Sequence, residues 1–221
     1  MPDYQVIIIG GGPAGVSAAL YLARAAIKTL IIENGPGALS RAHKIDNYYG
    51  VAASGSELYT KGLEQAKALG ITVINDEVLN VEYTDSFTVH LKNTAKILTA
   101  PVLLLATGTK NITLNLPELV EFEGKGVSYC AVCDGFFFRK KQVAVLGNSA
   151  YALHEAEYLK HLATSVTILT NGKDESVAVA AGFTVRKEVI KAIVGENKLQ
   201  SIHFAEGPAL NVDGLFIAMG T

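Results

Sequence analysis

Short apolar runs alternate with amphipathic segments along most of this chain. The first run, residues 4–9, is continuous rather than alternating, which is typical of a parallel strand buried on both faces. A glycine-rich turn follows it, then an alanine-rich segment from residue 13 to about 26 that predicts a helix, and a second apolar strand at residues 29–33. This order predicts a strand–helix–strand unit with a parallel sheet.

The pattern continues with further elements in the first half of the chain. Residues 77–99 alternate between apolar and polar positions with turn signals between them, which predicts a three-stranded antiparallel meander. The other elements expected here are a polar loop at residues 34–54, an amphipathic helix at about 56–69, and strands at 71–74 and 101–106.

A second strand–helix–strand pattern begins near residue 142. It consists of a strand at 142–146, a helix at 149–162 and a strand at 165–169, and shorter strands are expected at 184–186, 188–194, 200–205 and 215–219. Two such units in one chain predict an α/β fold with two dinucleotide-binding, Rossmann-like domains of three layers each, the first of which contains the meander.

The composition narrows the class of protein. Hydrophobic residues make up 49% of the 221 residues, enough for a substantial core, and the net charge is only −2. That balance gives no electrostatic reason to expect a nucleic acid or an anionic membrane as partner. The N-terminus lacks the pattern of a signal peptide, and no apolar stretch approaches the ~20 residues of a membrane helix. We therefore expect a soluble, cytoplasmic protein.

The first glycine turn, GGGPAG, fits the dinucleotide-binding pattern G-x-G-x-x-G between a strand and a helix. In that pattern Gly10 makes the tight turn, Gly12 lets the backbone approach a pyrophosphate, and Gly15 lets helix and strand pack closely. The first amides of the helix then face the phosphates. Glu33 ends the second strand, where a carboxylate accepts hydrogen bonds from ribose hydroxyls. A merely structural turn explains neither this spacing nor the three glycines, so we predict a nucleotide site.

The corresponding turn of the second unit, GNSAYA, departs from the pattern. Ser149 stands where the first unit has Gly12, and its side chain would occupy the place where a pyrophosphate approaches the backbone. Thr170 stands where the first unit has Glu33, and residues 171–175 contain no arginine to bind a 2′-phosphate. These losses together argue against a nicotinamide cofactor here, and we expect this unit to be kept as a scaffold.

Cys130 and Cys133 are the only cysteines of the chain, and they form a C-x-x-C pattern. Three origins are open for this pattern: a redox-active dithiol, one half of a zinc site, or coincidence. A zinc site needs four ligands, and the nearest histidine, His154, has no paired ligand at a usual spacing. The spacing and the shortage of further ligands favour the redox dithiol, and we predict no metal.

Four stretches together resemble the low-molecular-weight thioredoxin reductases: GGGPAG, ATGT at residues 106–109, GKGVSYCAVCDG at 124–135, and VDGLFIAMGT at 212–221. The resemblance implies FAD on the first domain, which would contain the meander, and a smaller inserted domain that carries the redox disulfide. It also implies a homodimer that reduces a small disulfide protein such as thioredoxin.

The resemblance implies roles for individual residues as well. Cys133 would be the thiol next to the flavin, Cys130 the thiol that attacks the partner's disulfide, and Asp134 the acid–base that handles the protons. The chemistry is coherent, because a thiolate is the attacking species and a neighbouring carboxyl can carry its proton. For Asp134, a plain turn or helix-cap aspartate before Gly135 is the open alternative. The residues implied to contact FAD are Gly10, Gly12, Pro13, Ala14, Gly15, Glu33, Asn34, Asn47, Thr107 and Gly108.

Departures from the family's pattern bear on the electron donor. The family has an arginine-rich stretch for NADPH where this chain has LTNGKDES at residues 169–176. The loop at residues 35–50 also differs from the family's usual G-G-Q-L-T motif. A smaller branch of the family lacks nicotinamide motifs and takes electrons from ferredoxin, and this chain resembles that branch. We therefore expect ferredoxin as donor; the alternatives are an ordinary NADPH-dependent reductase and a flavin-binding redox sensor or electron-transfer module without turnover.

The resemblance also predicts the domain boundaries. The domains implied are residues 1–110 for FAD, residues 111–212 for the inserted dithiol domain, and a return to the FAD domain at about residues 213–221. In the family a further segment follows and contacts the cofactor, whereas nothing in this sequence follows Thr221. Either the sequence is a fragment, or one wall of the site is missing and FAD is held weakly.

Overall fold

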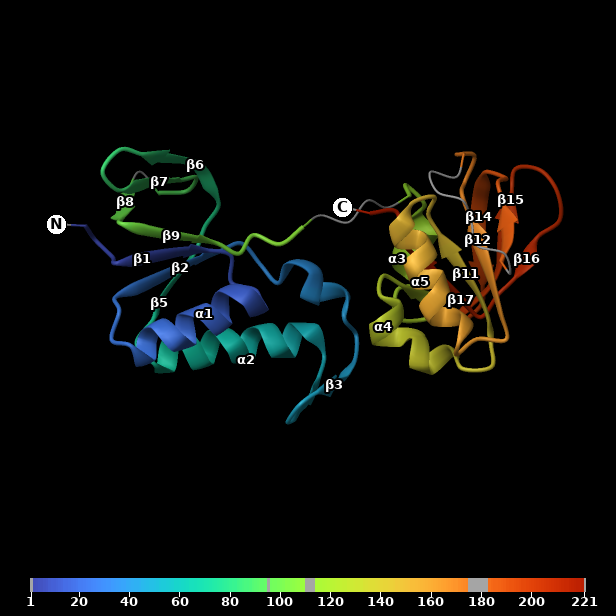
Figure 1. Cartoon of the computed structure of the whole chain (residues 1–221), viewed down its shortest axis with the longest axis horizontal. Coiled ribbons are helices and arrows are strands. Elements are labelled where there is room, and N and C mark those ends of the chain that lie inside the picture. Colours follow the sequence, from blue (N-terminus) through green and yellow to red (C-terminus); the bar gives the residue numbers. More distant parts are fainter. Residues whose placement is uncertain (1, 95, 110–113, 175–182, 221) are drawn as a thin grey trace. The chain divides into compact units, whose positions relative to one another are not determined.

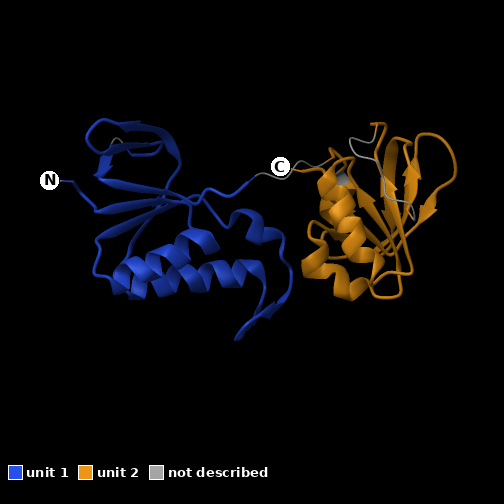
Figure 2. Ribbon diagram, in the orientation of Figure 1, with its two compact units in different colours: residues 1–109 blue, residues 110–221 orange. Residues whose placement is uncertain are grey.

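The computed structural model describes residues 2–94, 96–109, 114–174 and 183–220. The chain forms two compact units, residues 1–109 and residues 110–221 (Figure 2). Each unit has its own parallel sheet and its own hydrophobic core. The predicted α/β fold class is therefore confirmed.

A four-stranded parallel sheet forms the centre of the first unit (Figure 1). Its strands, in spatial order, are β5 (Thr72–Asn75), β2 (Thr29–Glu33), β1 (Val6–Ile9) and β9 (Val102–Leu105). The register pairs Val6 of β1 with Thr29 of β2 and Val102 of β9. The carboxyl ends of these strands therefore meet at one edge, which is where open parallel sheets bind ligands.

Two further layers cover this sheet. Helices α1 (Pro13–Arg24) and α2 (Gly55–Ala68) pack on one face, and the antiparallel meander of β6 (Val78–Tyr83), β7 (Phe87–Leu91) and β8 (Ile97–Ala100) packs on the other. Neighbouring side chains of β1 point to opposite faces, so that Ile8 contacts the helices and Ile7 contacts the meander. The three layers and the meander are as predicted.

The segment predicted as a polar loop, residues 34–54, contains regular structure. It forms the 3₁₀ helix η1 (Gly37–Arg41) and a β-hairpin of β3 (Ile45–Tyr48) and β4 (Val51–Ala53). The sequence does not indicate this hairpin, because its residues are exposed or half-buried and carry no alternating apolar pattern. Helix α2 then begins at a capping box in which Ser54 and Glu57 accept hydrogen bonds from each other's amides.

A five-stranded parallel sheet forms the centre of the second unit. Its strands, in spatial order, are β10 (Val127–Ser128), β17 (Gly214–Ile217), β11 (Gln142–Leu146), β12 (Ser165–Leu169) and β13 (Thr184–Arg186). The bounds of β11, β12 and β13 are those predicted, and most other predicted elements shift by a residue or two.

The predicted return of the chain to the first domain at about residue 213 is wrong for strand β17. This strand pairs with β10 on one side and with β11 on the other, so it lies inside the sheet of the second unit. Its side chains Leu215, Phe216 and Ile217 are at most 4% exposed, and the burial of this apolar run stabilises its place between two strands. Residue 221, the last of the expected return, lies outside the described residues.

Helices cover one face of the second sheet, and a small antiparallel sheet covers the other. The first face carries α4 (Ala131–Asp134), the 3₁₀ helix η2 (Gly135–Phe138) and α5 (Ala150–Lys160); the second carries α3 (Pro117–Glu121), β14 (Ile190–Gly195), β15 (Leu199–Phe204) and β16 (Leu210–Asn211). Several of these elements are too short to show a periodic pattern, which is why the sequence did not predict them. In the part of the chain that the structure describes, no helix is long and apolar enough to span a membrane.

Candidate active site

Two of the glycines in the turn after β1 lie against backbone that leaves no room for a side chain. Gly10 has a φ of +114°, and a Cβ on it would stand 2.1 Å from the Ala106 carbonyl oxygen. A Cβ on Gly15 would stand 2.0 Å from the Gly10 carbonyl oxygen. A larger residue at either position would push α1 away from the sheet. These contacts fix the start of α1 at the carboxyl end of β1.

Gly12 differs from these two glycines, because a Cβ on it would meet no atom within 4 Å. It is the N-cap residue of α1, and no side chain caps this helix. Pro13 occupies the first helical turn, where its fixed φ suits the helix. The first amides of α1 are therefore open beside a residue without a side chain, which is the arrangement that binds a pyrophosphate.

An open pocket of about 830 Å³ lies against this turn, within the usual range for cofactor sites. The predicted FAD contacts that line it are Gly10, Gly12, Pro13, Ala14, Asn34, Thr107 and Gly108. Two further stretches of the lining were not predicted: residues 35–39, which enter η1, and residues 76–78, which connect β5 to β6. Neither stretch carries a sequence motif that marks it as part of a pocket. The parallel order of β1, β2 and β5 brings both stretches there.

Glu33 lies outside this lining, and its carboxylate is already hydrogen-bonded. Oε2 accepts from the Tyr59 hydroxyl and, at 2.8 Å, from the Gly35 amide, while Oε1 accepts from Asn75 Nδ2 at 2.5 Å. Burial acts to raise the pKa of Glu33, but these hydrogen bonds outweigh it and hold the pKa below its usual value. The carboxylate is therefore ionised and fixed, and Oε1 keeps an acceptor position for a ribose hydroxyl.

Two more of the predicted FAD contacts, Gly15 and Asn47, lie outside the lining among the described residues. Gly15 acts on the site through its close approach to Gly10. Asn47 is exposed on β3, and its contact with FAD stays a prediction. The open start of α1, the pocket beside it and the ionised Glu33 fit the pyrophosphate and ribose of FAD.

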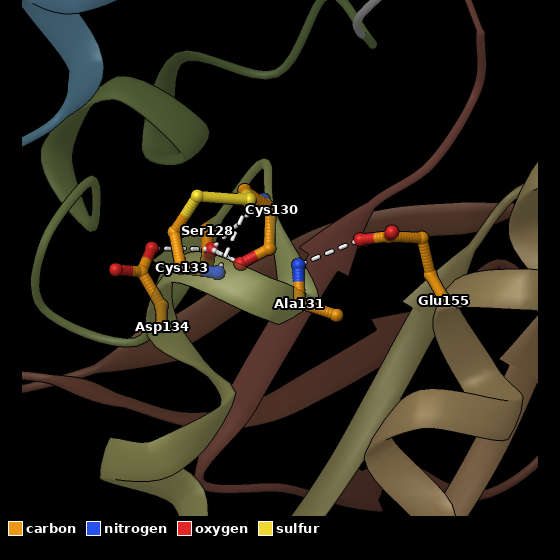
Figure 3. The surroundings of a disulfide bond; sticks show 6 residues. All are labelled: Ser128, Cys130, Ala131, Cys133, Asp134 and Glu155. Carbon is orange, nitrogen blue, oxygen red and sulfur yellow. Dashed lines mark hydrogen bonds between the residues drawn. A yellow bond between two sulfur atoms is a disulfide. The ribbon is translucent and has the colours of Figure 1, made fainter. Parts of the chain in front are cut away.

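In the second unit, Cys130 and Cys133 form a disulfide at the start of α4 (Figure 3). Cys130 is the N-cap residue of α4, and its Sγ accepts a hydrogen bond from the Cys133 amide at 3.2 Å. The same donor would stabilise a Cys130 thiolate after reduction. Cys133 is exposed and Cys130 is half-buried, so the disulfide is accessible from the surface of this unit. The bond also occupies both sulfurs that a zinc ion would need.

Asp134 is connected to the disulfide loop through Ser128. The Ser128 hydroxyl donates to Asp134 Oδ2 at 2.6 Å and accepts from the Cys130 amide at 3.1 Å. Asp134 is the N-cap residue of η2, yet its side chain makes no capping hydrogen bond. The plain helix-cap alternative therefore has no support, and the acid–base role of Asp134 stays a prediction.

Ser128 and Glu155 hold this loop, and neither was predicted from the sequence. Glu155 belongs to α5 and accepts a hydrogen bond from the Ala131 amide at 2.6 Å (Figure 3). Ser128 precedes Cys130 by two residues, and this closeness is the one signal that could have indicated it. For Glu155 no such signal exists, because only the packing of α4 on α5 brings it to the loop.

Exposed apolar side chains accompany the disulfide. Val132 lies between the two cysteines and is 52% exposed, while Phe136 and Phe137 in η2 are 64% and 37% exposed. The Arg139 guanidinium lies 5.5 Å from the centre of the Phe136 ring. Exposed apolar residues grouped in this way are typical of surfaces that bind other proteins.

The turn after β11 has the same backbone arrangement as the turn after β1, but a serine stands at the position of Gly12. A Cβ on Gly147 would stand 2.2 Å from the Ala218 carbonyl oxygen, just as Gly10 lies against the strand end of β9. Ser149 is the N-cap residue of α5, and its side chain makes no capping hydrogen bond. A hydroxymethyl group therefore stands where Gly12 leaves space.

The end of β12 also lacks the groups that bind an adenosine ribose. Thr170 is 2% exposed, and its hydroxyl has no hydrogen-bond partner among the residues that the structure describes. Arg186 on the neighbouring β13 donates to Glu188 Oε1 and to the Pro208 carbonyl. Its guanidinium also lies 3.9 Å from the centre of the Phe204 ring. Neither Thr170 nor Arg186 is therefore placed to bind a ribose or its 2′-phosphate; residues 175 and 176 of the predicted stretch lie outside the described residues.

Comparison with known proteins shows which family the chain resembles. A family model described as pyridine nucleotide-disulphide oxidoreductase matches residues 4–221. A thioredoxin reductase of Streptomyces coelicolor is 35% identical over 237 residues, covering 98% of this chain and 73% of that protein. A thioredoxin reductase of Rickettsia prowazekii is 34% identical over 238 residues, covering 98% of this chain and 76% of that protein.

A solved structure matches as well. The crystal structure of thioredoxin reductase from Streptococcus pyogenes superposes with a TM-score of 0.87 at 31% identity, covering 98% of this chain and 76% of that one. The similarity to these proteins therefore extends over both the glycine turn and the C-x-x-C disulfide. The chain belongs to the pyridine nucleotide-disulphide oxidoreductase family, and within it is an FAD-dependent oxidoreductase of the thioredoxin reductase type.

Proposed function

We propose that this protein reduces the disulfide of a thioredoxin-like protein with its Cys130–Cys133 dithiol, and that ferredoxin rather than NADPH supplies the electrons. The disulfide at the start of α4 carries this proposal, with the Cys133 amide bonded to Cys130 and with Asp134 held by Ser128. The first unit then corresponds to the FAD domain, and the second unit corresponds to the inserted dithiol domain.

The dithiol of the reduced protein supplies both electrons and both protons that reduce the partner's disulfide. In the reduced protein, the Cys130 thiolate attacks one sulfur of the partner's disulfide, forms a mixed disulfide and releases the partner's other sulfur as a thiolate. The Cys133 thiolate then attacks the Cys130 sulfur, which restores the Cys130–Cys133 bond and releases the second partner sulfur. The partner gains two electrons and two protons, and the dithiol loses the same number of each.

The residues around Cys130 support its role as the attacking thiol. Its Sγ already accepts the Cys133 amide, and that donor persists for the thiolate. Asp134 takes the proton from one thiol and returns a proton to the partner's leaving thiolate. Ser128 holds the carboxylate for this purpose through its 2.6 Å hydrogen bond.

The first unit holds the cofactor with residues that line its pocket and with Glu33, which lies between two of them in the sequence. Gly12 and the first amides of α1 take the pyrophosphate, and Glu33 takes a ribose hydroxyl through Oε1. Asn34 and Gly108 line the pocket on either side of this turn. When bound, FAD supplies a two-electron transfer, which matches the reduction of one disulfide.

The donor is inferred from the second unit. Membership of the family is equally consistent with NADPH, so the ferredoxin proposal depends on three residues. Ser149 carries a side chain at the position of Gly12, and Thr170 is buried at the end of β12. Arg186 is bound to Glu188 and therefore does not serve a 2′-phosphate.

An anaerobic reduction of the FAD-loaded full-length protein tests the donor. NADPH, NADH and reduced ferredoxin are added separately while the absorption band of the oxidised flavin is followed. We expect only reduced ferredoxin to bleach the band. If NADPH bleaches it within the turnover time, the donor is NADPH, and the protein is an ordinary thioredoxin reductase.

Variants of the cysteines test the reaction. Cys130→Ser and Cys133→Ser should each retain FAD and lose the reduction of thioredoxin disulfide, with Glu157→Gln on α5 as a control in the same unit. If Cys130→Ser reduces thioredoxin as fast as the unaltered protein, the dithiol is not on the route. If the unaltered protein itself shows no turnover with any donor, the non-catalytic sensor is favoured instead. The homodimer also stays a prediction, which sedimentation equilibrium of the FAD-loaded protein tests.

A further inference from the structure

Helix α4, which carries the disulfide, is mounted on α5. Four residues are too few to form a stable helix alone, so α4 depends on its contacts. Ala131 is fully buried in one cluster with Ala152, Ala156 and Leu159 of α5. At the other end of α4, a Cβ on Gly135 would lie 3.1 to 3.3 Å from side chains of Leu162, Leu159 and Tyr158. The helix that follows the altered fingerprint turn is therefore the support of the dithiol.

One polar contact accompanies this apolar packing. The Glu155 side chain lies in the interface, only 5% exposed, and its Oε2 accepts the Ala131 amide at 2.6 Å (Figure 3). Ala131 directly follows Cys130, so the carboxylate is bound to the residue next to the attacking sulfur. A buried carboxylate is costly unless it is hydrogen-bonded, and apolar packing alone could have held α4.

Tyr151 is a second titratable side chain of α5 close to Glu155. Tyr151 lies one turn earlier on α5, and its pKa is raised first by burial and then by the charge of Glu155. The other acidic group of the loop is Asp134, whose carboxylate is bound to Ser128. One carboxylate is therefore bound to Ser128, two residues before Cys130, and the other to Ala131, directly after it.

We propose that Glu155 is a positioning residue of the dithiol, which fixes the Ala131 amide and whose buried negative charge favours the disulfide over the dithiol. Two effects of the same contact act in this direction. The negative charge repels a Cys130 thiolate through a poorly solvated interface. The hydrogen bond also keeps the Ala131 amide on Glu155, so that this donor does not turn to the thiolate. A dithiol whose reduced form is less stable is a stronger reductant.

This inference rests on the proposed function, because it concerns a Cys130–Cys133 pair that cycles between disulfide and dithiol. The reaction measured is the transfer of two electrons and two protons between that pair and glutathione. The full-length protein is equilibrated with glutathione buffers of known ratio, and its free thiols are trapped by alkylation. The equilibrium constant then reports the stability of the disulfide without any electron donor or turnover.

Three variants separate the charge from the hydrogen bond. Glu155→Gln keeps an acceptor oxygen for the Ala131 amide and removes the charge, whereas Glu155→Ala removes both. Glu157→Gln is the matched control, since it removes a carboxylate of the same helix two residues further on. Because Glu155→Ala could fail to fold, the decisive comparison is between Glu155→Gln and Glu157→Gln.

We expect Glu155→Gln to shift the equilibrium toward the dithiol by roughly threefold to tenfold, a tenfold shift corresponding to about 30 mV in a two-electron couple. Glu157→Gln should leave the equilibrium unchanged. In the background of Cys133→Ser, Glu155→Gln should also speed the alkylation of Cys130 at a fixed pH, because more of the thiol is ionised. Far-UV circular dichroism and thermal unfolding of Glu155→Gln should match those of the unaltered protein.

Two results would overturn the inference. One is an equilibrium constant for Glu155→Gln that equals that of the unaltered protein, since a merely structural hydrogen bond survives in glutamine. The other is an equal shift in Glu157→Gln, which would show a general effect of helix charge. A Cys130–Cys133 pair that does not exchange with glutathione at all would instead contradict the proposed function itself.

Discussion

The turns after β1 and after β11 share one backbone plan, and the difference between them that bears on a ligand lies at the helix N-cap. Both begin with a glycine that lies within van der Waals contact of a neighbouring strand end, Gly10 against Ala106 and Gly147 against Ala218. At the helix N-cap, however, Gly12 faces open space and Ser149 presents a side chain. The close packing is thus kept in both units, while the space for a ligand is kept in one.

The ends of β2 and β12 extend the same contrast. Glu33 is ionised and holds three hydrogen bonds, whereas the buried Thr170 hydroxyl has no partner in the described part of the chain. The polar group at the end of β2 is thus held by its neighbours, whereas the one at the end of β12 is not. The two units teach that one backbone plan can be kept while the polar groups around it differ.

The largest effect is expected from making the first turn like the second. Gly12→Ser should lower the affinity for FAD by roughly 100-fold, or about 2.7 kcal/mol, because the new side chain occupies the path of the pyrophosphate. The first unit should still fold, since a Cβ at this position meets no atom within 4 Å. Fluorescence titration with FAD and thermal unfolding of the apoprotein measure the two quantities. An unchanged affinity would show that the pyrophosphate does not lie at this turn.

A smaller effect is expected at the end of β2. Glu33→Gln should lower the free energy of unfolding by about 2 kcal/mol at neutral pH, because hydrogen bonds to a charged acceptor are lost or weakened. The pKa of Glu33 is lowered in the folded state from its usual 4.5, so its stabilisation is present above that value and is lost as the pH falls through the folded pKa. Denaturant unfolding of both proteins from pH 7 to pH 3 should therefore show a difference that shrinks on acidification. A difference independent of pH would contradict the assignment.

The equivalent position of the second unit should respond in the opposite direction. Thr170→Val replaces a buried hydroxyl without a partner by a methyl group of similar size. We expect the variant to be more stable by about 1 kcal/mol, because burying an unbonded hydroxyl is costly. Urea unfolding followed by circular dichroism measures this, with Thr167→Val on β12 as the comparison. A loss of stability would indicate that the Thr170 hydroxyl does have a partner in solution.

The smallest effect is expected from making the second turn like the first. Ser149→Gly should change stability by a few tenths of a kcal/mol, because the serine side chain makes no capping hydrogen bond. It should not create binding of NADPH, since Thr170 and Arg186 remain as they are. Isothermal titration with NADPH checks this, and measurable binding would show that Ser149 alone blocks the site.

Much of the fold could be predicted because its main elements carry strong local patterns. The continuous apolar strands, the glycine turn and the alternating meander are all readable within a few residues of chain. The hairpin of residues 45–53 and the place of β17 could not be predicted in this way. The first has no apolar period, and the second depends on which neighbour an apolar strand finds in space.

The same division holds for the candidate site. The glycine turn and the cysteines were evident from spacing, because their chemistry requires residues close together in sequence. The pocket wall at residues 76–78, Tyr59 and Glu155 were not, because each reaches its site from a distant part of the chain. The sequence of an ordinary helix such as α5 does not distinguish a buried carboxylate from a solvent-exposed one.

The position of β17 between β10 and β11 also bears on the order in which the protein assembles during synthesis. The four described strands of the first sheet, and the described residues that line its pocket, have all emerged once Thr109 has been made. The sheet of the second unit lacks an inner strand until Ile217 has emerged, so that β10 and β11 have no common neighbour before then. The nucleotide-binding unit can therefore fold on the ribosome while the cysteine-bearing unit is still open. The two cysteines are thus made well before the sheet beneath them can close.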